Sequence, residues 1–243
     1  MTYIENPKTK GSGIICCIPQ SGTCPVGCPE CFFQSGRSYL EPLAEHLPNM
    51  PPVEMAYGRV VRVNDGNDSC HDFETVVRTT SQYPMKFYNT SMYANCLPKF
   101  PAPVVLTVNP GKKTDTDFHE VDPIPKNLMM VRARTNTWNL DLVDKIVEYY
   151  SQKEIPIILT FMAYHNEDSV PVADRGCYTY RKRTTNPYYA IKTDAWRAIM
   201  GRYEDNMWVY SCGKIEGERG MTGCRRCGNC LREYFATMER MRT

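Results

Sequence analysis

Two groups of cysteines are the residues of this sequence whose type and spacing indicate metal chemistry. Cys24, Cys28 and Cys31 have the spacing CX3CX2C, and a second group near the C-terminus has three of its four thiols at CX2CX2C spacing: Cys212, Cys224, Cys227 and Cys230. Thiolates are soft ligands that select zinc or iron–sulfur clusters over hard cations. In a reducing compartment, such groups indicate metal ligands more often than disulfides.

The number of thiols in the first group indicates which kind of site it forms. A structural zinc site has four closed ligands, yet no fourth Cys or His lies close to this group, and His46 is 15 residues beyond Cys31 across a predicted helix. A [4Fe–4S] cluster held by three cysteines leaves one iron open to an exogenous ligand. An open iron predicts catalysis.

The remaining five cysteines are scattered along the chain and are predicted to be small buried hydrophobic residues. They are Cys16, Cys17, Cys70, Cys96 and Cys177.

Short apolar segments alternate with helical ones over the first two-thirds of the chain, which is typical of βα units around a parallel sheet. Six such units predict an α/β fold, a parallel sheet curled into a partial or complete barrel. A flat doubly wound sheet remains open, because periodicity does not reveal strand order. Strands are predicted at 13–18, 59–63, 86–90, 103–108, 128–134 and 155–161, and helices at 38–47, from Phe73 through Val77, after a cap at Asn139 and at 193–203.

The composition changes beyond residue 205, where glycine and cysteine dominate. Residues 1–204 are therefore predicted to form the core, and residues 205–243 a small cluster-binding extension. A segment of this size needs a cross-link such as a bound metal ion, because it cannot bury enough apolar surface to be stable by itself.

The CX3CX2C loop, placed directly after a first strand in a chain of βα units, resembles the radical S-adenosylmethionine (SAM) enzymes. The resemblance covers roughly residues 12–165. It implies a partial (β/α)6 barrel in which Cys24, Cys28 and Cys31 hold a [4Fe–4S] cluster whose open iron binds the amino and carboxylate groups of SAM. One electron from the reduced cluster then cleaves SAM, and the resulting 5′-deoxyadenosyl radical abstracts hydrogen from an organic substrate.

The same resemblance implies where SAM is contacted. The turn after the second strand, Asn64-Asp65-Gly66-Asn67-Asp68, would meet the methionine amino group through Asn64, Asp65, Gly66 or Asp68, although a turn that merely reverses the chain is the alternative. Thr107 and Asn109 would contact the ribose or the carboxylate. Arg134, which shares a face of the fifth strand with Arg132, would hold the carboxylate through its guanidinium.

Two features depart from the family pattern. Glu30 stands where the family usually has an aromatic residue before the third cysteine, with Phe32 and Phe33 after it. The turn at 64–68 lacks the usual paired glycines and the Glu-Pro that follows them. These two departures weaken the assignment of the contacts to SAM more than the assignment of the cluster ligands.

The second cysteine group resembles a ferredoxin-like cluster loop and, beside a radical SAM core, implies an auxiliary [4Fe–4S] cluster. Taken alone, its spacing suits zinc equally well. If Cys212 is a ligand, the cluster is closed and relays electrons or braces the tail. If Cys212 is free, an open iron remains for a substrate.

Charge and hydropathy constrain the partners. Residues 171–243 carry 14 Lys and Arg against 8 Asp and Glu, which favours an anionic substrate such as a nucleotide, although a peptide or a small metabolite also fits. The resemblance implies a reductant such as flavodoxin or ferredoxin. A zinc-stapled module that binds nucleic acid through the basic tail is the alternative from another class. Without an apolar run of roughly 18 residues or a secretory signal, we expect no membrane association and a cytoplasmic protein.

Overall fold

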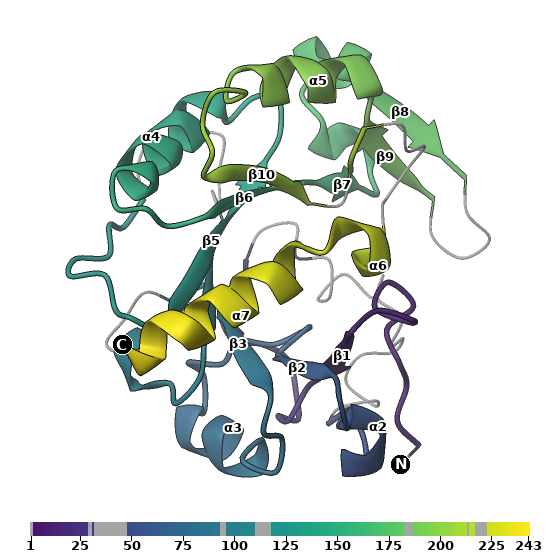
Figure 1. The fold of residues 1–243 in the computed structure, drawn as a ribbon. Coiled ribbons are helices and arrows are strands. Elements are labelled where there is room, and N and C mark those ends of the chain that lie inside the picture. Colours follow the sequence, from purple (N-terminus) through teal and green to yellow (C-terminus); the bar gives the residue numbers. More distant parts are fainter. Residues whose placement is uncertain are drawn as a thin grey trace. The chain divides into compact units, whose positions relative to one another are not determined.

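The computed structural model describes residues 2–28, 31, 48–92, 96–109, 118–182, 187–212, 214–216 and 223–243, and it has a mixed α/β fold (Figure 1). The helix predicted at 38–47 lies outside the described residues. The chain separates into two compact units, one made of Met1–Thr107, Val121–Val131 and Gly223–Thr243, the other of Val108–Glu120 and Arg132–Thr222. In the described parts of the chain, every helix is too short or too polar to span a membrane.

A seven-stranded sheet contains all six predicted strands, each within two residues of its expected bounds. The strand pairs with a known register, β1–β2, β2–β3, β3–β4 and β6–β10, are all parallel. The prediction of an α/β fold with a parallel sheet is therefore confirmed. The strand order is β1 (Ile14–Cys17), β2 (Val60–Val63), β3 (Lys86–Thr90), β4 (Val104–Val108), β5 (Leu128–Thr135), β6 (Ile157–Phe161) and β10 (Val209–Cys212).

Residues of β1, β2 and β3 alternate between two faces of the sheet. Because partners in register point to the same side, Cys17 and Val63 share a face with Tyr88, whose hydroxyl lies 3.2 Å from Thr80 Oγ1 at the end of α3 (Phe73–Thr79). A short helix, α2 (Val53–Ala56), precedes β2. The alternate positions, which include Cys16 and Arg62, point to the opposite face.

The C-terminal helices α6 (Cys224–Cys227) and α7 (Asn229–Arg242) belong to the same unit as β1, β2 and β3 (Figure 1). The backbone N–H of Cys224 donates to Lys8 O at 2.9 Å, and Arg240 Nε donates to Lys126 O at 3.1 Å. Leu231 packs so closely on Gly13 that a Cβ there would be 2.9 Å from its Cδ1. Residues 223–243 are thus packed against the N-terminal part of the chain.

The second unit contains α4 (Leu140–Ser151), α5 (Thr193–Gly201) and a three-stranded antiparallel sheet in the order β7 (Ala163–Tyr164), β9 (Tyr188–Ile191), β8 (Tyr178–Arg181). Asn139 occupies the N-cap position of α4, as predicted, but its side chain bonds no helix N–H. It accepts from Asn136 N at 2.9 Å and donates to Arg134 O at 2.8 Å instead. As predicted, α4 buries one apolar face, which consists of Leu142, Val143, Ile146, Val147 and Tyr150.

Candidate functional site

The loop with the CX3CX2C spacing directly follows β1, as the sequence predicts, and its three cysteines are half-buried. Gly27 makes the turn between the first two cysteines with φ +61°, a conformation that glycine adopts without strain. Cys31 N donates to Cys28 O at 3.2 Å. Cys28 Sγ lies 3.9 Å from the hydroxyl of Ser91, which follows β3. The loop therefore reaches the carboxyl end of β3.

The three thiols of this loop are close enough to affect one another electrostatically. Burial raises the pKa of Cys24, a hydrogen bond from the Val26 backbone opposes this rise, and negative charge on Asp68, Cys28 and Cys31 adds to it, so that the resulting pKa is about 11. A free thiol in this environment is predominantly protonated at neutral pH. A metal would have to displace that proton on binding.

Within the residues that the structure describes, no group of three or more His, Cys, Asp or Glu side chains is arranged so that it could hold a metal ion. The fit of the CX3CX2C loop to a cluster therefore depends on ligand type, on spacing and on the shared position of its thiols after β1. Cluster binding would require the three sulfur atoms to turn toward a common centre.

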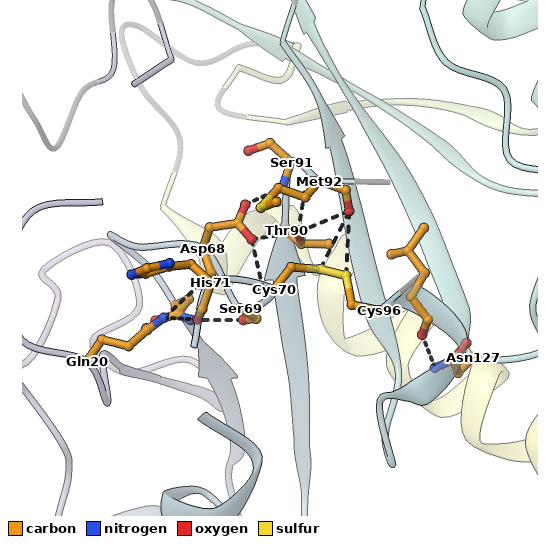
Figure 2. Close-up of a disulfide and its surroundings, with 12 residues drawn as sticks. Gln20, Asp68, Ser69, Cys70, His71, Thr90, Ser91, Met92, Cys96 and Asn127 are labelled. Atoms are coloured by element: carbon orange, nitrogen blue, oxygen red, sulfur yellow. Dashed lines mark hydrogen bonds between the residues drawn. A yellow bond between two sulfur atoms is a disulfide. The ribbon is translucent and has the colours of Figure 1, made fainter. Parts of the chain in front are cut away.

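Asp68 connects the loops that follow β2 and β3 (Figure 2). Its side chain is buried, and Oδ1 accepts hydrogen bonds from Thr90 Oγ1 at 2.7 Å and from Cys70 N at 2.9 Å. Oδ2 accepts from Ser91 N at 2.6 Å. The sequence predicts Asp68 as a contact for the SAM ammonium, but in the structure both of its oxygens hold protein donors.

The other carboxylate of the predicted SAM-binding turn, Asp65, also bonds protein groups. Its two oxygens accept from the guanidinium of Arg62 and from the amide of Asn6. Gly66, which completes the predicted set in this turn, is half-buried. The turn therefore uses its charged side chains to fix the chain itself.

Two buried amide oxygens near this turn have no hydrogen-bond partner. Asn64 has a positive φ of 60° and donates to Ser69 Oγ at 3.0 Å, which leaves its Oδ1 without a donor. Gln20 donates to Asp68 O at 2.8 Å and to His71 O at 2.6 Å, and its Oε1 is likewise unpaired. Buried acceptors without donors indicate a missing ligand or water. Sequence reasoning missed Gln20, although its place between β1 and the cysteine loop was a usable signal.

Cys70 and Cys96 form a disulfide, so the prediction that both are isolated buried residues is wrong. Their Cα atoms are 5.9 Å apart, and the bond links the loop after β2 to the loop after β3, next to Met92 (Figure 2). The two cysteines are 26 residues apart in sequence, and only the parallel pairing of β2 with β3 brings them together.

Removing this disulfide is expected to destabilise the protein. The double substitution Cys70→Ser and Cys96→Ser should lower the free energy of unfolding by about 3 kcal/mol, because the closed loop of this length restricts the unfolded chain. Urea denaturation monitored by circular dichroism measures the change, and dithiothreitol should reproduce it in the native sequence. Thiol titration of the denatured, unreduced protein should find ten of the twelve cysteines reactive, and twelve would contradict the pairing.

The remaining predicted SAM contacts lie on β4, β5 and the residue after β4. Thr107 is half-buried and belongs to the first unit, whereas Asn109, Arg132 and Arg134 belong to the second. Arg134 is buried and Arg132 half-buried. Their roles toward SAM stay predictions.

The second cysteine group is divided between the units. Cys212 ends β10 in the second unit, while Cys224, Cys227 and Cys230 are on α6 and α7 in the first. Cys230 is buried and the other three are half-buried. On the face of β2 that lies opposite α3, Arg62 interacts electrostatically with Cys224 and Cys230.

Comparisons of the chain with protein-family models, with curated proteins and with solved structures found no match. Function is therefore inferred from the residues and their geometry.

Proposed function

We propose that this protein is a radical SAM enzyme with a partial (β/α)6 barrel. The observation that carries the proposal is the position of Cys24, Cys28 and Cys31, which share the loop after β1 of a parallel sheet and interact electrostatically. In sheets of parallel strands, ligands bind beyond the carboxyl ends of the strands. A three-thiol loop there suits a cluster with one open iron better than a closed zinc site.

In this proposal Cys24, Cys28 and Cys31 are the ligands of a [4Fe–4S] cluster. When bound and reduced, the cluster supplies one electron that splits SAM into methionine and a 5′-deoxyadenosyl radical, which takes a hydrogen atom from an organic substrate. The unpaired Oε1 of Gln20 and Oδ1 of Asn64 are suited to accept hydrogen bonds from the methionine ammonium. Asp68 holds the loops after β2 and β3 in place around them.

The proposal includes a second site and a class of partners. Cys224, Cys227 and Cys230, with or without Cys212, would hold an auxiliary [4Fe–4S] cluster. The excess of positive charge beyond residue 170 favours an anionic substrate such as a nucleotide. A small electron carrier such as flavodoxin or ferredoxin would supply the reducing electron.

Reductive cleavage of SAM is the direct test of this proposal. The full chain, reconstituted anaerobically with iron and sulfide, should become brown and should form 5′-deoxyadenosine from SAM after addition of dithionite, as measured by liquid chromatography and mass spectrometry. Omission of dithionite is the control and should give no product. A cluster-loaded protein that forms no 5′-deoxyadenosine would contradict the proposal. A colourless protein that retains tetrahedral zinc would favour the alternative, a zinc-containing module that binds nucleic acid.

A further inference from the structure

Lys214, two residues after β10, is a buried cation without a counter-ion. The residue is only 4% exposed, and its Nζ donates to Thr193 Oγ1 at 3.1 Å and lies 5.9 Å from the centre of the Trp196 ring. Among the described residues, no carboxylate lies within 4.0 Å of this ammonium. An ammonium has three N–H donors, and buried charges in proteins are normally paired. An anion is therefore missing beside Lys214.

The chain around Ser211 holds Lys214 in this position. Ser211 Oγ donates to Lys214 O at 2.6 Å and accepts from Trp196 Nε1 at 3.0 Å. Trp196 is itself one of the buried residues of α5. The place of the ammonium is thus set by the backbone and by a core side chain, which distinguishes it from a surface lysine.

The helix α5 begins at the residue that Lys214 contacts. Thr193 is the first residue of this nine-residue helix, and no side chain caps its first turn. The N-terminus of a helix carries partial positive charge, so an anion is favourable there and a cation is unfavourable. Thr193 is half-buried and Asp194 is exposed, so this end of α5 reaches solvent. Two sources of positive charge therefore meet at Thr193.

The acidic side chains of this region do not neutralise that charge. Glu216 Oε1 and Oε2 accept from Arg197 Nε at 3.1 and 3.2 Å, and Asp194 Oδ1 lies 3.5 Å from Arg197 Nη1. The side chains of Glu216 and Asp194 are 60% and 96% exposed. Burial and the positive charge of Arg181 lower the pKa of Lys214, which shows that the more distant charge of Glu216 does not compensate for them.

We propose that Lys214 and the N-terminus of α5 form a binding site for a phosphate group. The Lys214 ammonium, the Thr193 hydroxyl and the first backbone N–H groups of α5 would each donate to one of its oxygens. A phosphate monoester has three free oxygens and roughly two negative charges, and helix N-termini commonly bind such groups. All of these donors lie in the second unit, so the inference does not depend on the CX3CX2C loop or on cleavage of SAM.

Calorimetric titration of the full chain at constant ionic strength tests this site. The probes are inorganic phosphate and adenosine 5′-monophosphate, with adenosine as the uncharged control. Both phosphates should bind and adenosine should not. Lys214→Met keeps the length of the side chain but removes its charge, so it should weaken the binding of both phosphates at least about tenfold, as expected for the loss of a hydrogen bond to a charged group. Thr193→Val, which removes only a hydroxyl, should weaken it less.

Thermal unfolding separates ligand binding from a structural role. Without phosphate, the Lys214→Met variant should unfold at the same temperature as the native sequence or at a higher one, because the substitution removes a buried charge that has no partner. Phosphate should raise the unfolding temperature of the native sequence but not that of the variant. A lysine that serves only the fold predicts that Lys214→Met lowers the unfolding temperature.

Lys192→Met is the matched control. Lys192 is adjacent to the same helix end, but it is exposed and its ammonium donates to Gly176 O at 2.6 Å. Its loss should change the phosphate affinity less than about twofold, because solvent and salt screen an exposed charge.

Four outcomes would overturn the phosphate site. They are equal phosphate affinity of the Lys214→Met variant and the native sequence, an equal loss in the Lys192→Met variant, no phosphate binding by the native sequence, and binding of adenosine as tight as that of its monophosphate. None of them bears on the formation of 5′-deoxyadenosine, and failure of that reaction leaves the phosphate measurements standing.

Discussion

Replacing Cys28 with alanine should reduce the formation of 5′-deoxyadenosine more than about 100-fold, since even residues that merely support metal ligands change affinity by up to that amount. Cys28 is the central thiol of the CX3CX2C loop, and its sulfur lies beside Ser91 at the carboxyl end of β3. Without it, two protein thiols remain for the cluster. The measurement compares the initial rate of 5′-deoxyadenosine formation, normalised to bound iron, in the variant and in the native sequence.

The matched control for this loss is Cys177→Ala. Cys177 is half-buried like Cys28 but ends the short helix η3 (Val172–Cys177) in the second unit. Its substitution should change the rate by less than a factor of about two, because surface and half-buried changes outside special sites cost little stability. Equal rates for the Cys28→Ala variant and the native sequence would remove Cys28 from the ligand set. A loss in both variants would show that the assay reports general thiol damage.

Neutralising Asp68 should destabilise the protein strongly. In Asp68→Asn, an NH₂ group replaces one oxygen of a buried side chain whose two oxygens accept from Thr90 Oγ1, Ser91 N and Cys70 N. The NH₂ group of the asparagine then faces one of these N–H or O–H donors. The remaining hydrogen bonds are weaker, because their acceptor is no longer a charged carboxylate. We expect a decrease of about 3 kcal/mol in the free energy of unfolding, measured by urea denaturation, because hydrogen bonds to charged groups contribute about 1.5–3 kcal/mol each.

Asp72→Asn is the control for this change, since it is the same chemical substitution four residues later. Asp72 is exposed, and its side chain caps no N–H of α3. Its replacement should change stability by less than about 0.5 kcal/mol. If the two variants unfold at the same urea concentration, the contacts of Asp68 do not stabilise the loops after β2 and β3.

The strands were predictable because each is a short apolar run bounded by residues that break strands. β1 ends shortly before Pro19, and β4 follows Pro103. β10 was missed because Val209-Tyr-Ser-Cys212 is half polar and only half-buried, and its place in the sheet comes from pairing with β6. The antiparallel sheet of β7, β8 and β9 was missed because its strands have only two to four residues.

The place of the three-thiol loop after the first strand was predictable from the sequence, but its surroundings were not. The spacing of Cys24, Cys28 and Cys31 placed a three-thiol loop after β1 without any knowledge of the fold. The pairing of Cys70 with Cys96 depends on strand neighbours, and the electrostatic interaction of Arg62 with Cys224 joins positions far apart in the chain. Neither interaction has a local signal, because both arise only when distant segments pack together.

The interleaving of the two units has a consequence for synthesis on the ribosome. The unit that contains Arg132–Thr222 has left the peptidyl transferase centre before α7 is made, whereas the unit with the CX3CX2C loop still awaits Gly223–Thr243. Neither unit has its full set of strands and helices until synthesis of the chain is almost finished, so we expect both to complete their folding late. Protease protection of stalled nascent chains would measure this, and early protection of residues 48–107 would refute it for the first unit.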